Sequence, residues 1–156
     1  RNKNNKKFYK FIHYLRKEKK MEEFQIWQIW SSNRIGSGLV GIGSILAVWL
    51  SMRIALNTRN NPETNLLTKI VSSAFGLVVL SFGWIQSTTV ANTWIAASRS
   101  LSELKASGTE ISSTADGYIA YVGTTEAVTT PTPLGIAFFV VSGIIILGQI
   151  WLPKQN

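Results

Sequence analysis

The stretch that decides the fold class lies at residues 35–57 and reads IGSGLVGIGSILAVWLSMRIALN, with Arg53 as its single charge. An α-helix rises about 1.5 Å per residue, so roughly 20 residues cross a hydrocarbon core of about 30 Å. A charge-poor run of this length is typical of a membrane-spanning helix, and we expect the first span here.

Two further stretches have the same character. Residues 66–87 carry one charge, Lys69, near the start, and residues 134–152 carry none. Pro133 and Pro153 flank the last stretch, as expected for a proline in the first helical turn and one just past the end. Three such segments in 156 residues leave little polar surface to cover them, which disfavours three buried helices of a soluble domain. The sequence therefore predicts an all-α integral membrane protein with three transmembrane helices.

The region before the first span, residues 1–34, is strongly basic. Nine of the sixteen Lys and Arg residues fall within its first twenty positions. We expect an amphipathic segment that lies on anionic lipid headgroups, with an acidic protein surface as an alternative target. Its apolar side, if it is helical, consists of Phe8, Phe11, Ile12, Tyr14 and Leu15.

Residues 88–133 form the largest region outside the predicted spans. Its first half lacks proline and glycine before Gly108, so we expect the second span to continue as a helix to about Ala106. The second half is rich in Thr and Ser, and Asp116-Gly117 between short β-prone runs favours a small β-hairpin. A flexible loop is the alternative. The emergent helix carries an apolar stripe at spacings of three or four: Val90, Trp94, Ala97, Leu101 and Leu104.

Small residues recur along one side of each of the first two spans. They let helix backbones approach closely, which promotes association where lipid surrounds both helices. The simplest arrangement packs the first span directly against the second. The residues predicted to pack are Ser37, Gly41, Ser44, Ser72, Gly76 and Gly83.

Basic and aromatic side chains cluster near the predicted borders of the spans. Long basic side chains can lie along lipid and place their charge among the headgroups, and tryptophan is at home at the same depth. For Arg53 and Lys69, an interfacial role is favoured over a place on an ion-conducting path, because both charges lie near a loop. The predicted interfacial anchors are Arg53, Lys69, Trp27, Trp30, Trp84 and Trp151.

Composition excludes several classes of function. The chain has no cysteine and one histidine, so we expect no disulfide, Fe–S cluster, zinc finger, catalytic metal site or thiol nucleophile. No phosphate-binding loop, dinucleotide fingerprint or nucleophile elbow is present. We expect no catalytic residue, no metal, no small-molecule substrate and no cofactor of its own, with bound lipid as the single candidate ligand. Nucleic acid is not an expected partner, because no nucleic-acid-binding motif accompanies the basic tail.

These observations predict a non-catalytic accessory subunit of a larger energy-transducing or oxidative membrane complex, with other membrane subunits as partners. The first alternative is a small homo-oligomeric transporter or channel. The second alternative is a membrane-anchored recruiter whose basic tail captures acidic lipid or a soluble partner. The basic tail favours an N-terminus in the cytoplasm or an organellar matrix. We expect the bacterial or archaeal cytoplasmic membrane, or an organellar inner membrane.

Overall fold

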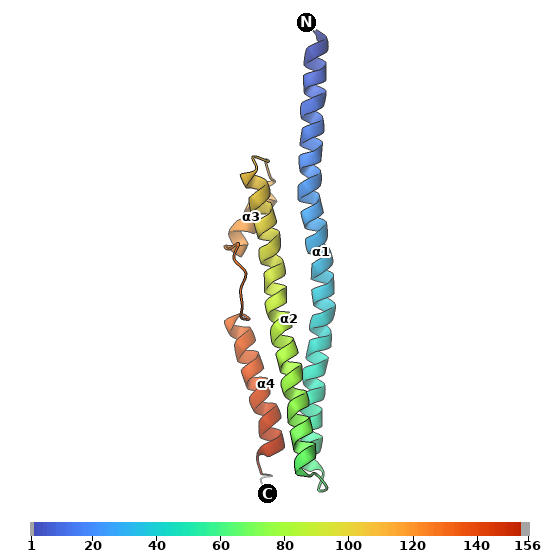
Figure 1. The fold of residues 1–156 in the computed structure, drawn as a ribbon, viewed down its shortest axis with the longest axis vertical. Coiled ribbons are helices and arrows are strands. Elements are labelled where there is room, and N and C mark those ends of the chain that lie inside the picture. Colours follow the sequence, from blue (N-terminus) through green and yellow to red (C-terminus); the bar gives the residue numbers. More distant parts are fainter. Residues whose placement is uncertain (1, 154–156) are drawn as a thin grey trace. The chain divides into compact units, whose positions relative to one another are not determined.

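The computed structural model describes residues 2–153, and the side chains of residues 2–5, 8 and 15–21 are not among those described. Four helices make up the described chain: α1 (Asn2–Asn60), α2 (Leu66–Ala106), α3 (Ser113–Val122) and α4 (Pro133–Trp151) (Figure 1). No strand occurs among these residues. Phe8 and Leu15 of the predicted apolar side lie outside the described side chains.

Three of the helices are long and apolar enough to cross a membrane by length and composition. The candidate spans fall within Glu22–Asn60, Leu66–Ala106 and Pro133–Trp151. The first two contain the stretches expected from the sequence, and the third ends at Trp151, one residue before the expected end at 152. The predicted all-helical fold with three such helices is confirmed. The helical continuation beyond the second span is also confirmed, because α2 ends at Ala106.

The chain divides into two compact units. The first, which we call the lobe, consists of Arg1–Ile35 and Asn92–Ala127. The second, the span unit, consists of Gly36–Ala91 and Val128–Asn156. Each unit takes part of α1 and part of α2; α3 belongs to the lobe and α4 to the span unit.

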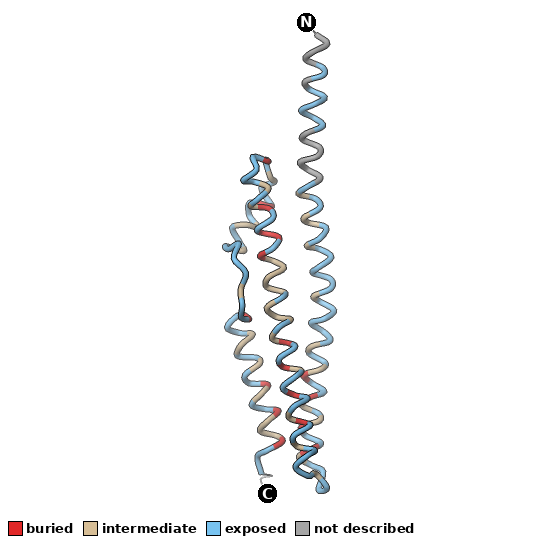
Figure 2. The backbone as a smooth tube through the Cα atoms, in the orientation of Figure 1, coloured by how far each residue is buried: buried red, intermediate tan, exposed pale blue. Residues whose placement is uncertain are grey.

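Buried residues in the span unit recur at helical spacing. In α4 the buried positions are Ser142, Ile146 and Ile150, which fall on one side of the helix (Figure 2). This side packs on α2, where Leu80 is buried in the same core. The core of the unit consists of Val48, Ala55, Leu80, Ile146 and Ile150, with Met52, Val79 and Phe139 packed against it.

Polar caps close the ends of the span-unit helices. Asn65 Oδ1 accepts a hydrogen bond from Thr68 N at 2.9 Å at the start of α2. Thr132 caps α4 by accepting from Gly135 N at 3.2 Å, and Pro133 follows it in the first turn. These side chains satisfy backbone N–H groups that the first turn of a helix leaves unpaired.

One buried polar contact joins α1 to α2 within the span unit. The hydroxyls of Thr58 and Ser72 lie 2.8 Å apart, and both residues are buried. Thr64 adds a hydrogen bond from its hydroxyl to the carbonyl oxygen of Thr58 at 2.7 Å. These bonds hold the two helices together next to the turn that connects them.

Ser72→Ala should leave the Thr58 hydroxyl without its partner and lower the free energy of unfolding of the span unit by about 1 kcal/mol, as interhelical hydrogen bonds in apolar bundles do. Ser81→Ala removes an exposed hydroxyl of the same helix and should change it by less than about 0.5 kcal/mol. Unfolding in mixed detergent micelles measures both. A double-mutant cycle with Thr58→Val should show coupling between the two positions, and its absence would contradict the assignment.

The lobe contains a helix where the sequence suggested either a β-hairpin or a flexible loop, so both predictions are wrong for residues 113–122. Ser112 caps α3 by accepting a hydrogen bond from Ala115 N at 3.1 Å, and Asp116 lies in the first turn, where a negative charge is favourable. The helix ends at Val122 and is capped by Gly123, whose φ of 68° suits glycine. Asp116-Gly117 therefore lies inside a helix, and the capping serine decides the local structure.

Candidate functional site

The residues that the structure describes contain no group of three His, Asp or Glu side chains that could hold a metal ion. The features that could serve a function are therefore surfaces and packed clusters. They are the small-residue helix faces, an apolar groove, the lobe cluster and the start of α1.

The small residues of α2 contact α4. A Cβ atom built at Gly76 would lie 2.7 Å from Ile146 Cγ2, and one built at Gly83 would lie 2.8 Å from Phe139 Cε1. Distances this short leave no room for a side chain. Both glycines are thus sites where α4 approaches the backbone of α2 closely.

The glycines of α1 have a different environment. Nothing lies within 4 Å of a Cβ atom built at Gly41, and the same holds for Gly36, Gly38 and Gly43. The arrangement expected from the sequence, with Gly41 against the second span, does not occur. The physical reason is that Ile146 and Phe139 of α4 already occupy the glycine positions of α2. Contact between α1 and its neighbours instead uses Val48, Ser51, Ala55 and Thr58, all of which are buried.

The three predicted packing serines lie in different surroundings. Ser72 is buried and bonded to Thr58. Ser44 is half-buried and donates to the carbonyl oxygen of Val40 at 2.9 Å, so its hydroxyl is satisfied within α1. Ser37 is half-buried. Ser72 is therefore the one serine of the three with a described bond to another helix.

An open apolar groove runs between α1 and α2 in the span unit. Its volume is about 350 Å³. The small residues Gly43, Ser44 and Ala47 line the groove on the α1 side, and Phe82 lines it on the α2 side. The full lining is Val40, Gly43, Ser44, Ala47, Val78, Val79 and Phe82.

Two predicted anchors of the span unit, Lys69 and Trp151, form contacts near the turn between α1 and α2. Lys69 Nζ lies 5.7 Å from the centre of the Trp151 ring, whose Nε1 donates to Ser73 Oγ at 2.9 Å. Trp84 lies beside Phe139, with ring centres 5.9 Å apart, and Arg53 is exposed. A role at a headgroup layer stays a prediction for these residues.

Trp27 and Trp30 belong to an aromatic cluster in the lobe. Trp30 meets Trp94 edge to face at 5.5 Å, and Tyr118 stacks on Trp94 with ring centres 5.9 Å apart. The guanidinium carbon of Arg34 lies 4.8 Å from the centre of the Trp94 ring, within the range of a cation–π interaction. We call this set the aromatic cluster: Trp27, Trp30, Trp94 and Tyr118, with Arg34 over it.

The aromatic cluster was missed at the level of sequence. The sequence predicts Trp27 and Trp30 as interfacial anchors and places Trp94 in the apolar stripe of the emergent helix, without joining them. A signal was present, since Trp27, Trp30 and Arg34 follow at three and four residues and so share one side of α1. Burial raises the pKa of the Tyr118 hydroxyl, which donates to the carbonyl oxygen of Trp94 at 3.2 Å.

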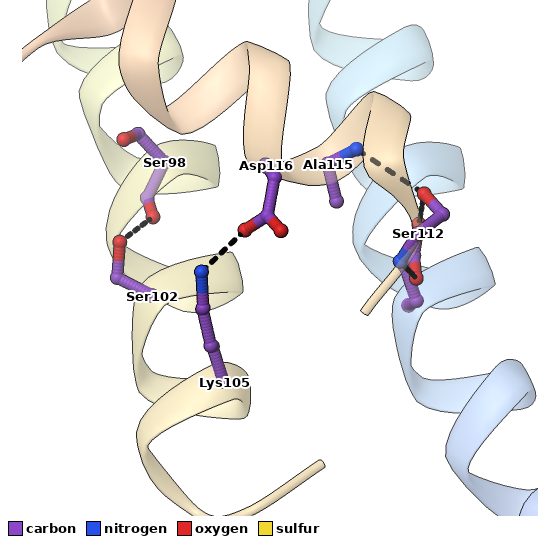
Figure 3. A network of polar contacts seen from close by, with 7 residues as sticks. Ser98, Ser102, Lys105, Ser112, Ala115 and Asp116 are labelled. Carbon is purple, nitrogen blue, oxygen red and sulfur yellow. Dashed lines mark hydrogen bonds and ion pairs between the residues drawn. The ribbon is translucent and has the colours of Figure 1, made fainter. Parts of the chain in front are cut away.

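Polar contacts attach α3 to the rest of the lobe (Figure 3). Lys105 Nζ lies 2.7 Å from Asp116 Oδ1. The Glu23 carboxylate accepts from both the backbone N and the hydroxyl of Ser112, at 3.0 and 2.6 Å, and from Trp27 Nε1 at 3.1 Å. Partial burial raises the pKa of Glu23, but these hydrogen bonds outweigh burial and hold the pKa below its ordinary value.

Because the pKa of Glu23 is lower in the folded lobe, its carboxylate stabilises the lobe above the unfolded pKa of about 4.3, and this contribution is lost as the pH falls through the folded value. Glu23→Gln should therefore destabilise the lobe by about 1 kcal/mol at pH 7 and reduce its loss of stability on acidification. Hydrogen exchange of residues 113–122 between pH 7 and pH 3 measures this. The exposed neighbour Glu22, changed to Gln, should behave like the unmodified chain, and an equal effect there would contradict the assignment.

The start of α1 presents basic and apolar side chains together. The described side chains from Lys6 to Tyr14 are exposed, among them Lys6, Lys7 and Lys10. Phe11 is 57% exposed and Ile12 45% exposed. The arrangement combines positive charge with unburied apolar surface on one helical segment.

The described part of the chain thus offers surfaces for packing and for interaction. Similarity to known proteins does not indicate what these surfaces bind. Comparison with protein-family models, with curated protein sequences and with solved structures finds no match to this chain.

Proposed function

We propose that this chain is a multi-pass integral membrane protein and a non-catalytic accessory subunit of a larger membrane complex. The expected parent is an energy-transducing or oxidative complex. Membrane insertion is supported by the three long apolar helices and by the large apolar side chains exposed along them. Leu39 and Ile45 of α1 and Val78 of α2 are 65–67% exposed. Such surfaces are unfavourable in water and suit lipid or a protein partner.

The single observation that carries the subunit role is the open surface around the glycines of α1. Four glycines within eight residues have open space at the position of a side chain. The adjoining groove is floored by small side chains and bordered by Phe82. In lipid, small residues favour helix association because backbones can approach closely. A helix from another membrane subunit fits the groove at Gly43, since α4 already occupies the positions at Gly76 and Gly83 of α2.

The test begins with native membranes solubilised in mild detergent. We expect the chain to migrate on a native gel in a large band with other subunits, which mass spectrometry then identifies. Gly43→Leu should fill the groove and release the chain from that band while leaving its own fold intact. Ala137→Leu adds similar bulk at an exposed position of α4 and should stay in the band.

Two results would overturn the subunit proposal. Migration as a small species that contains only this chain would favour the homo-oligomeric transporter, which flux measurements in liposomes would then examine. Turnover of a substrate by the purified chain would contradict a non-catalytic role.

A further inference from the structure

The start of α1 holds the chain's entire excess of positive charge. The first twenty residues contain nine basic residues and one acidic residue, which equals the net charge of +8 for the whole chain. Lys6, Lys7 and Lys10 are exposed, and none of them forms an ion pair with another described side chain. The partner of this segment therefore carries negative charge.

The segment also has a defined apolar side. At 100° per residue, Phe11 and Ile12 point to one side of α1, and Lys6 and Lys10 point to the opposite side. Lys7 lies beside Phe11 on this wheel. Phe11 and Ile12 remain about half exposed, with no element of the described chain covering them. A partner that fits the segment must accept apolar side chains as well as charge.

We propose that residues 6–14 of α1 bind the anionic surface of a lipid bilayer. The proposal includes a bend in α1 between this segment and the first span, because an unbent helix would hold residue 12 about 35 Å from residue 35. Phe11 and Ile12 enter the boundary between headgroups and acyl chains, and the lysines remain among the anionic headgroups. A nucleic acid or another polyanion satisfies the charge but leaves the apolar side chains in water. A bilayer satisfies both requirements at once. The charge balance of the segment and its apolar side together favour lipid.

The absence of cysteine from the chain allows a direct test. The purified full chain is reconstituted in liposomes with a single cysteine at position 12, 10 or 13, which carries a nitroxide label. In liposomes with about 30% anionic lipid, we expect the label at 12 to be shielded from a water-soluble relaxation agent and accessible to oxygen. The labels at 10 and 13 should both remain in water, because both positions lie far from the apolar side of the segment. In zwitterionic liposomes all three should be in water.

Two variants separate charge from apolar contact. Replacement of Lys6, Lys7 and Lys10 by Gln should lower the ratio of bound to unbound segment in anionic liposomes by about 100-fold, at roughly fivefold per lysine. The double substitution Phe11→Ser and Ile12→Asn should also lower the ratio of bound to unbound segment, although the charge is unchanged. In this variant the label is placed at position 9. Salt at about 0.5 M should weaken binding, because it screens exposed charge.

Several outcomes would overturn this proposal. The first is a label at position 12 that is equally immersed in anionic and zwitterionic liposomes. The second is a label at position 12 that remains in water in both. Binding of a soluble polyanion that survives the change of Phe11 and Ile12, without immersion in anionic liposomes, would assign the segment to a nucleic acid or an acidic protein. The measurement uses the purified chain alone, so it can fail or succeed independently of the accessory-subunit role.

Discussion

Gly76→Leu should lower the free energy of unfolding of the span unit by about 3 kcal/mol. The reason is steric, since even a Cβ atom at position 76 would lie 2.7 Å from Ile146 Cγ2. Isoleucine is branched at Cβ and has few alternative rotamers, so its methyl group cannot move aside easily. The larger leucine must therefore displace α4. Reversible unfolding in mixed detergent and SDS micelles measures the loss.

Gly41→Leu is the matched control for this prediction. It makes the same chemical change in a helix of the same unit, where nothing lies within 4 Å of the new Cβ atom. We expect the stability of the isolated chain to stay within about 1 kcal/mol, with a small gain because leucine favours helix more than glycine does. Equal losses at the two positions would contradict the packing of α4 on α2.

Trp94→Ala should destabilise the lobe by about 3 kcal/mol, at the lower end for loss of a packed tryptophan because Trp94 is only half-buried. The change removes the ring that contacts Trp30 edge to face, stacks on Tyr118 and accepts the Arg34 guanidinium. Hydrogen exchange or limited proteolysis of residues 92–127 measures the loss of order. The span unit should keep its stability.

Tyr121→Ala provides the control within the lobe. Tyr121 is 78% exposed, although its ring centre lies 6.2 Å from that of Trp94. We expect a loss of less than about 1 kcal/mol, since little area is buried. If the two substitutions had the same effect, the aromatic cluster would not be what holds α3 in place.

The helices could be predicted from the sequence because length and hydropathy act over some twenty residues at once. The end of α2 at Ala106 followed from the lack of proline and glycine before Gly108. The Asp116-Gly117 pair was misleading because it occurs both in tight turns and within helices. Ser112, which caps α3 and binds Glu23, lies 89 residues from that carboxylate, so a local pattern could not reveal the contact.

Packing was only partly predictable for a related reason. A stripe of small residues indicates that some helix can approach, but it does not specify which one. Gly76 and Gly83 contact a helix that begins more than forty residues later, whereas Gly41 contacts none of the described chain. For the same reason, the grouping of Trp27 and Trp30 with Trp94 and Tyr118 depends on tertiary contacts that spacing along α1 alone does not fix.

The hydrogen bond between Thr58 and Ser72 has a consequence for the order of events during synthesis. Its two residues are 14 positions apart, so the α1–α2 hairpin can close as soon as α2 has left the ribosome. Ile146 and Phe139 have not yet left the ribosome at that moment. For this interval the glycines of α2 are as open as those of α1, and the nascent hairpin can bind a foreign helix at the site that α4 later takes. The time between emergence of residue 106 and emergence of residue 146 then sets how long this competition lasts.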